Sequence, residues 1–467
     1  MFYGATSFNQ NINTSGSSWN TAAVTSMADM FREASSFNGN ISSWNTAAVT
    51  GMSHMFRSAT AFNGNISSWN TAAVTGMSFM FELATAFNQN ITSWNTAAVN
   101  NMGHMFKSAT SFNQNINTSG SSWNTAAVTD MAEMFKGATA FNGNITSWNT
   151  AAVTNMDLMF NGATSFNQDI SSWNTAAVTT MTQMFRGASA FNQNINTSGN
   201  SWNTTAVTNM YYMFQGATAF NGNISSWNTA AVTDMSVMFS GATAFNQNIS
   251  SWNTAAVIRT IDMFSGATSF NQPLTHSGNS WNLEDVTDMT NMFNGATGFS
   301  IANYNIFLYS QANNSGINSN ITITAASKYS DATSRTYLTE TKNWTINDGG
   351  VEASVAPTVS SVTSTKANGT YIIDALIPIT LTFNEVVNVT GTPQITLETG
   401  GTDAVVNYSS GTGSNTLTFN YTVAAGHTSA DLDYVATTSL ALNSGTIKDT
   451  TNNNATLTLP SPGATRS

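Results

Sequence analysis

The chain contains no cysteine, and only 7% of its 467 residues are charged, whereas an ordinary globular protein has about 25% charged residues. The lack of cysteine excludes a disulfide scaffold, a thiolate zinc site and a cysteine nucleophile. Twelve Lys and Arg against 23 Asp and Glu give a net charge of −11 without a basic run, so nucleic acid is not an expected partner. No apolar run reaches the roughly 18 residues that a membrane span needs.

The main feature that is present is a repeat of 25 residues, marked by a Trp-Asn pair at Trp19, Trp44, Trp69 and onward. In one-letter code the unit reads WNTAAVTxMxxMFxxATxFNxNIxS, where x stands for a variable position. Some copies have 29 residues, because they contain a four-residue insert. Met1 falls in the middle of a unit, and no secretory signal is visible there, so we expect the chain to be part of a longer protein.

Each unit shows two kinds of local pattern. Apolar residues recur every three to four positions near its start: Val24, Met27, Met30, Phe31 and Ala34. This spacing predicts a short helix, with Thr25 as its N-cap. The stretch 37–44 is rich in Asn, Gly and Ser, which favours an extended or turn-like segment. We therefore expect each coil to contain one short helix and one short strand.

A unit of this length cannot bury its apolar side chains alone. Copies must therefore stack, which predicts a repeat solenoid in which each unit contacts only its neighbours. The asparagine columns, such as Asn20 with Asn45 and Asn38 with Asn63, suit ladders of side-chain amides, because each amide has donors and acceptors.

The pattern divides the chain into three parts. Residues 1–300 predict a solenoid of about 12 coils. Residues 301–355 break the repeat and predict an irregular α/β cap, with helices at 304–311 and 330–341 and a strand at 321–324. Residues 356–467 are rich in Thr, Val and Ser with short alternating strands, which predicts an all-β Ig-like sandwich.

The repeat strings VTxMxxMF and WN in residues 1–300 resemble those of the BspA-like leucine-rich-repeat surface proteins of bacteria. The strings TFNEVVNVTGTP at 382–393 and IKDTTNNNATLTL at 447–459 resemble the tandem Ig/cadherin-like repeats of large bacterial surface proteins. These resemblances imply an LRR-like solenoid with a C-terminal cap, an extracellular location at the cell surface, and a role in adhesion without catalytic residues.

The sequence shows no catalytic motif, and we expect the chain not to be an enzyme. His54 and His104 occupy the same repeat position two coils apart, with Phe79 between them. They are too far apart for a shared metal ion, and we interpret them as exposed polar side chains at a variable position.

Four acidic residues in the C-terminal part of the chain form one candidate cation site. Asp431 and Asp433 alternate in an expected strand, so both carboxylates can project from one face. Glu385 and Asp449 lie in the strings that the Ig-like resemblance associates with calcium, which prefers oxygen ligands from several loops. The four residues form a candidate calcium site; the alternative is that they are ordinary solvent-facing acids.

The inserts are the candidate binding residues. We expect Asn117–Gly120, Asn196–Gly199 and Thr275–Gly278 to form a row of bumps, and we expect a partner to contact this row, or the polar Gln, Asn and Ser columns beside it, repeatedly. The alternative is that they are tolerated surface loops.

The predicted function is that of an adhesion module with a multivalent polar face. Its partner would be a glycan, a matrix protein, or a protein of a host or neighbouring cell. We expect no cofactor other than calcium. The alternative is a structural subunit of a surface layer or extracellular filament that assembles by self-association.

Overall fold

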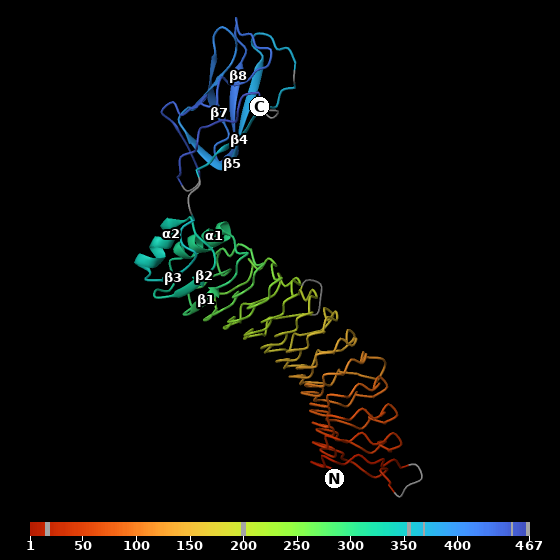
Figure 1. Cartoon of the computed structure of the whole chain (residues 1–467). Coiled ribbons are helices and arrows are strands. Elements are labelled where there is room, and N and C mark those ends of the chain that lie inside the picture. Colours follow the sequence, from red (N-terminus) through yellow and green to blue (C-terminus); the bar gives the residue numbers. More distant parts are fainter. Residues whose placement is uncertain (15–18, 198–201, 353–355, 368, 450–451, 464–467) are drawn as a thin grey trace. The chain divides into compact units, whose positions relative to one another are not determined.

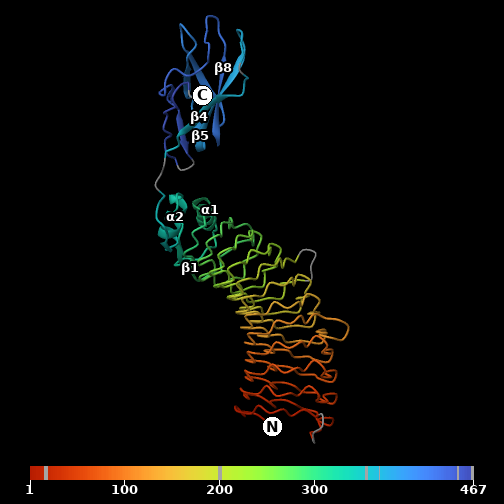
Figure 2. The ribbon, with the colours of Figure 1, turned by 45° about the vertical axis from the view of Figure 1, so that its right-hand side comes forward.

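The computed structural model describes residues 1–14, 19–197, 202–352, 356–367, 369–449 and 452–463. The chain divides into two compact units, Met1–Val351 and Glu352–Ser467. Unit 1 is a stack of coils that ends in a group of short helices, and unit 2 consists mainly of strands (Figures 1 and 2).

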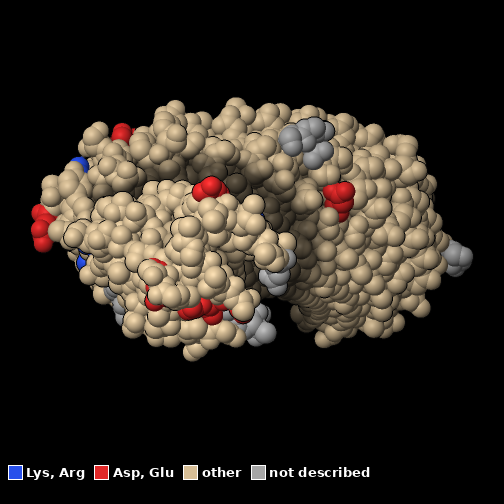
Figure 3. All heavy atoms as spheres, turned by 90° about the horizontal axis from the view of Figure 1, so that it is seen from above, with Lys and Arg blue, Asp and Glu red and all other residues tan. Residues whose placement is uncertain are grey.

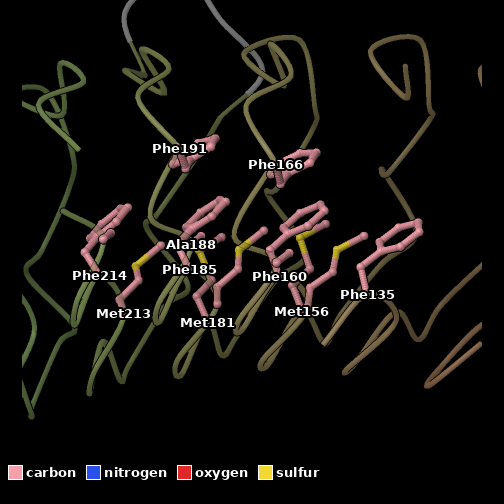
Figure 4. Close-up of a cluster of buried hydrophobic side chains, with 14 of the residues drawn as sticks. Phe135, Met156, Phe160, Phe166, Met181, Phe185, Ala188, Phe191, Met213 and Phe214 are labelled. Atoms are coloured by element: carbon pink, nitrogen blue, oxygen red, sulfur yellow. The ribbon is translucent and has the colours of Figure 1, made fainter. Parts of the chain in front are cut away.

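Each coil of unit 1 carries three aromatic residues, and most of their rings stack on the equivalent rings of the next coil. For one pair of coils the ring centroids are 5.6 Å apart for Phe31–Phe56, 5.8 Å for Phe37–Phe62 and 6.3 Å for Trp44–Trp69. The indole Nε1 of Trp44 also donates to the carbonyl of Ile12 in the preceding coil at 2.7 Å. Figure 4 shows the same rows of Met and Phe side chains further along the stack. The tandem repeats of residues 1–300 thus share one row of buried aromatic and Met side chains.

The coils are not evenly spaced across their width. The centroid separation rises from 5.6 Å in the Phe31 column to 6.3 Å in the Trp44 column. Coils that are closer on one side produce a curved stack with that side inward, and Figure 1 shows the bend. The Met-Phe segment of each coil therefore lies toward the inner side of the curve.

The helix predicted after Thr25 is wrong, because residues 28–33 form a series of tight turns. Alternate N–H groups donate to the next coil at 2.7–3.1 Å: Met27 to Gly51, Asp29 to Ser53, Phe31 to Met55 and Glu33 to Arg57. Asp29 and Glu33 have φ angles of +55° and +63°, which an α-helix does not contain. The apolar residues recur every three to four positions because local hydrogen bonds close the turns, such as the one from Met30 N–H to Met27 C=O at 3.2 Å.

The short strand predicted in each coil is also wrong for the described coils before Met289. There, single parallel bridges such as Ser26 with Gly51 join neighbouring coils. Among the described residues, helices occur only from Ile301 onward. The coils are thus held by lateral hydrogen bonds between turns, which leave no regular element within one coil.

The two asparagine columns behave differently. Oδ1 of Asn38 accepts from the backbone N–H of Asn63 in the next coil at 2.8 Å, so this ladder joins side chain to backbone. Oδ1 of Asn45 accepts from the N–H of Ala47 in its own coil at 3.1 Å. A ladder therefore forms in the first column, although it joins side chains to backbone and not amide to amide as predicted. The prediction is wrong for the second column.

The stack ends in a cap of short elements. These are β1 (Met289–Phe293), α1 (Ile301–Ala312), β2 (Thr322–Ala325), α2 (Ala332–Thr336), the π-helical turn η1 (Tyr337–Thr341) and β3 (Thr345–Asn347). The three strands pair in parallel in the order β1-β2-β3, which continues the lateral bonds of the coils. Helix α1 confirms the helix predicted at 304–311, and α2 with η1 confirms the one at 330–341.

Unit 2 is built on a curled antiparallel sheet. Its strands are β4 (Val359–Ser364), β5 (Leu376–Thr390), β6 (Gln394–Leu397), β7 (Ala404–Ser410), β8 (Ser414–Thr422), β9 (Leu440–Ala441) and β10 (Thr446–Asp449). The order is β10-β5-β8-β7-β6-β9, and β4 also pairs with β5. An irregularity between Thr382 and Val387 divides the long β5, so that β4 pairs with its first part and β10 with its second. Alternate residues of β5, among them Leu381 and Phe383, are buried in the core.

Candidate ligand-binding face

Five positions of the repeat differ between coils, and they lie side by side in unit 1. In the first full coil they are Ser26, Ala28, Asp29, Arg32 and Glu33. The lateral hydrogen bonds of this segment place each residue next to its equivalents in the neighbouring coils. We call the surface formed by these five positions in all coils the variable face. Sequence reasoning missed it as a site, although the x positions between the fixed Met, Phe and Ala of the repeat mark it.

The variable face concentrates the charge of the coils. It carries every Lys and Arg of residues 1–300: Arg32, Arg57, Lys107, Lys136, Arg186 and Arg259. It also carries nine of the twelve acids there: Asp29, Glu33, Glu82, Asp130, Glu133, Asp157, Asp234, Asp262 and Asp288. Little of the surface seen in Figure 3 is charged, in keeping with the composition.

Alternating charges join four consecutive coils at the start of this face. The N–O distances are 2.5 Å for Arg57–Glu82, 3.5 Å for Glu82–Lys107, 2.7 Å for Lys107–Glu133 and 3.1 Å for Lys136–Glu133. Burial alone would raise the pKa of Glu133, but hydrogen bonds from Lys107 and Lys136 outweigh it and lower that pKa. The Glu82 side chain is only 5% exposed, so it depends on its two cationic partners. The charges in these coils therefore largely neutralise one another.

His54, Phe79 and His104 form a column of stacked rings on the same face. The centroid of the Phe79 ring lies 4.6 Å from that of the His54 ring and 4.1 Å from that of the His104 ring. Both histidines are partly buried, so the prediction that they are exposed polar side chains is wrong. Burial lowers the pKa of each, which favours neutral imidazole near neutral pH.

Two positions of the variable face hold left-handed backbone, and they are occupied differently. At the position of Glu33, seven later coils have glycine, with φ between +66° and +70°: Gly137, Gly162, Gly187, Gly216, Gly241, Gly266 and Gly295. At the position of Asp29, which we call the apex position, φ lies between +52° and +60° and no described coil has glycine. The apex residues are Asp29, His54, Phe79, His104, Glu133, Leu158, Gln183, Tyr212, Val237, Asp262 and Asn291. A left-handed non-glycine residue costs about 1–2 kcal/mol, so side chains are kept at the apex against the backbone preference.

A second cluster lies further along the face, where one coil has two adjacent aromatic residues. The rings of Tyr211 and Tyr212 meet edge to face, with centroids 4.1 Å apart. The guanidinium of Arg186, in the preceding coil, lies 5.2 Å from the centre of the Tyr212 ring. This cluster combines a cation, two phenols and polar neighbours at one place.

The first of the predicted binding inserts contacts its own chain. Oδ1 of Asn117 accepts from the N–H and the hydroxyl of Ser147 in the next coil, at 2.7 Å and 2.6 Å. Ser119 and Ser122 exchange two backbone hydrogen bonds of 3.0 Å, and Gly120 takes the left-handed turn between them with φ of +61°. The Asn117–Gly120 insert is thus a tight hairpin whose asparagine holds the next coil.

The other two inserts are also attached to neighbouring parts of unit 1. Oδ1 of Asn196 accepts from the N–H of Ser226 at 2.9 Å, while Gly199 lies outside the described residues. In the insert Thr275–Gly278, the N–H of His276 donates to the hydroxyl of Ser310 in α1 at 2.5 Å. Ligand binding by the inserts stays a prediction.

The predicted calcium ligands have individual surroundings. Burial, with the nearby charge of Asp449, raises the pKa of Glu385. The carboxylate of Asp433 accepts from the N–H groups of Tyr434 and Gly463. Asp431 lies at a bend, so the strand predicted to align it with Asp433 is wrong. In the described part of the chain, no group of three or more His, Asp or Glu side chains could hold a metal ion. Calcium binding stays a prediction.

A family profile described as "Mycoplasma protein of unknown function, DUF285" matches the chain four times in tandem, over residues 1–69, 43–119, 117–201 and 196–306. The chain belongs to this family. The DUF285 matches span the coils and with them the whole variable face. Comparisons with curated proteins and with solved structures gave no match. Among the described residues, no helix has the length and apolar character needed to cross a membrane.

Proposed function

We propose that the chain is a non-enzymatic binding module of an extracellular surface protein and that it adheres to its partner through the variable face. In this proposal unit 1 is an LRR-like solenoid of the BspA-like type, and unit 2 is an Ig-like sandwich that acts as a spacer. The stacked coils and the curled antiparallel sheet support this assignment.

The observation that carries the proposal is the contrast between the columns of the repeat. The Met, Phe, Ile and Trp columns are nearly constant and buried, because they make the core of the stack. Four of the five positions of the variable face differ from coil to coil, and the fifth, that of Glu33, differs among the early coils and is glycine in the seven later ones. Lateral hydrogen bonds hold this segment in each coil. If the variable face served only to stack the coils, the same residues could occupy it in every coil. Variation on an otherwise uniform scaffold suits recognition of a partner over many small contacts.

The backbone strain at the apex position supports the same interpretation. Glycine would relieve the left-handed conformation there, as it does at the neighbouring position in the coils from Gly137 onward. Each coil instead keeps a side chain, including a β-branched one at Val237, for which positive φ is especially unfavourable. Strained residues that are retained in this way are typical of functional sites.

The test is adhesion of beads coated with the full chain to surfaces coated with mucin, fibronectin or collagen. We expect the double variant Phe79→Asn, Tyr212→Asn to reduce adhesion, because asparagine at the equivalent Asn291 shows that the backbone accepts it. The matched control is Ala47→Ser with Ala72→Ser, two exposed positions outside the variable face. Equal adhesion of both variants and the parent would remove the variable face from the mechanism. Ordered polymers of the purified chain, seen by light scattering and lost in the first variant alone, would favour the alternative of a structural subunit.

A further inference from the structure

We infer that Arg186, Tyr211 and Tyr212 form a subsite for a carboxylated sugar, with the carboxylate bound by Arg186 and the sugar ring packed against the tyrosines. This inference rests on the proposed function, because it places a ligand on the variable face. It adds the position of a subsite and the chemical class of the ligand.

Arg186 differs from the other cations at its repeat position. Each of those takes part in an ion pair with a carboxylate: Arg32, Arg57, Lys107 and Lys136. The guanidinium of Arg186 instead donates to two neutral amides, from Nε to Gln215 Oε1 at 2.5 Å and from Nη1 to Gln183 Oε1 at 3.1 Å. Among the described residues it has no ion pair, and its Nη2 group has no hydrogen-bond partner.

The side chain of Arg186 is therefore held in place but keeps its charge available. Two amides and the Tyr212 ring fix the guanidinium plane, and the residue is exposed. A planar guanidinium with a free edge is the group that binds carboxylates with two parallel hydrogen bonds. Because its orientation is set before a ligand arrives, little side-chain entropy is lost on binding.

The tyrosine pair supplies an aromatic surface next to this cation. No other coil has aromatic residues at both of these adjacent positions. Tyr211 and Tyr212 are half-buried, so parts of both side chains remain open to a ligand. The hydrogen bond with Tyr212, together with burial, raises the pKa of Tyr211 to about 12, so its phenol stays protonated. The pair thus offers an apolar surface for the C–H groups of a sugar ring and keeps its polar O–H groups.

The polar groups around the tyrosines favour a sugar over an acidic peptide. Asn209 uses Oδ1 to accept from Tyr211 N–H at 2.8 Å, and Asp234 uses Oδ1 to accept from Ser236 N–H at 2.8 Å. In the described structure, the Nδ2 group of Asn209 and the second carboxylate oxygen of Asp234 have no hydrogen-bond partner. The hydroxyl groups of a saccharide both donate and accept, so they can use both of these groups. An acidic side chain offers only acceptors, which suit Arg186 and Asn209 but not the carboxylate of Asp234.

The experiment is titration calorimetry of the full chain with three probes: 3′-sialyllactose, a hyaluronan tetrasaccharide and lactose. The first two carry a sialic acid and a uronic acid, so they distinguish the two sources of the carboxylate, and lactose is the neutral reference. We expect at least one carboxylated probe to bind about tenfold or more tightly than lactose, because a hydrogen bond to a charged group is lost with the neutral sugar.

Variants taken from the repeat itself connect this binding to the site. Arg186→Gln introduces the residue found at the equivalent Gln215, and Tyr211→Thr introduces that of Thr182. We expect Arg186→Gln to weaken binding of the carboxylated probe about tenfold or more and to leave the binding of lactose unchanged. Tyr211→Thr should weaken all sugars that bind. Lys366→Gln, which removes one positive charge in unit 2, is the matched control and should change nothing.

Several results would overturn the inference. The first is equal binding of lactose and of both carboxylated probes. The second is unchanged binding of the carboxylated probe by an Arg186→Gln variant that keeps the thermal midpoint of the parent. The third is a hexaglutamate peptide that binds as tightly as the carboxylated probe. If no sugar binds while bead adhesion still depends on the variable face, the sugar subsite fails and the proposed function stands. If adhesion does not depend on that face either, both fail.

Discussion

The backbone oxygen of Gln114 occupies the place that a β-carbon would need at Gly143 in the next coil, at a distance of 2.0 Å. The same relationship joins Gln10 to Gly39 and Gln193 to Gly222, at 2.1 Å and 2.0 Å. Each of these three glycines follows a coil that carries a four-residue insert. The insert and the glycine of the following coil are therefore parts of one arrangement.

We expect Gly143→Ala to destabilise the chain by about 1–3 kcal/mol, because the new methyl group would overlap a backbone oxygen that cannot move without its coil. Gly64→Ala is the control, since the nearest backbone oxygen there, that of Gly39, would lie 3.6 Å from the added methyl carbon. Urea unfolding measures both. Deleting 117–120 should restore much of the stability of Gly143→Ala, because most coils that follow a coil without an insert carry glutamine at this position, as at Gln168. Equal losses in the two alanine variants would contradict this explanation.

The sequence allowed the stack and its core to be predicted, but not the path of the chain within a coil. The constant Phe and Trp columns required stacking, since no single unit could bury them. The spacing of Met27, Met30 and Phe31 fits a helix and a series of tight turns equally well. Glycine at Gly137 and in later coils, inside the predicted helix, was the available sign of left-handed backbone.

The candidate site was predicted less well than the core. The inserts interrupt the repeat, which favoured them as binding residues, yet the side chains of Asn117 and Asn196 form hydrogen bonds with their own chain. The variable face was visible as the x positions of the repeat formula. The sequence could not show which of these charged side chains neutralise each other. Arg57 and Glu82 do so, whereas Arg186 has no such partner among the described residues. That depends on contacts between coils.

The left-handed position of Glu33 gives a simple stability test at Leu83, its equivalent two coils later. Leu83 has a φ of +59° and is 40% exposed, so its side chain contributes little packing to offset the strain. We expect Leu83→Gly to raise the free energy of unfolding by about 1 kcal/mol, since later coils already have glycine there. Gly187→Ala, at φ of +66°, should lower it by a similar amount, about 1 kcal/mol. A loss of stability in Leu83→Gly would show that its packing outweighs the strain.

The stacked histidines predict a pH dependence of stability. Burial lowers the pKa of His54 and His104 below 6.5, so the unfolded chain binds protons that the folded chain does not. Stability should therefore fall as the pH drops through 6.5 toward the folded pKa values. Glu133, whose pKa is lowered from 4.5, contributes stability that is lost only below that range. Thermal midpoints measured between about pH 7.5 and about pH 5.5 test this, and His54→Gln with His104→Gln should flatten the curve. An unchanged slope in the double variant would assign the dependence to other groups.

The insert asparagine separates a structural role from a binding role. Asn117 uses only its Oδ1 atom to accept two hydrogen bonds from Ser147, one from the N–H and one from the hydroxyl. Aspartate retains this acceptor and removes the amide donor, whereas alanine removes both. We expect Asn117→Ala to lower the free energy of unfolding by about 1–2 kcal/mol and Asn117→Asp to leave it nearly unchanged. If the variable face alone binds the partner, neither change should reduce bead adhesion at a temperature where both variants are folded. Reduced adhesion in Asn117→Asp, with stability intact, would return the insert row to the binding mechanism.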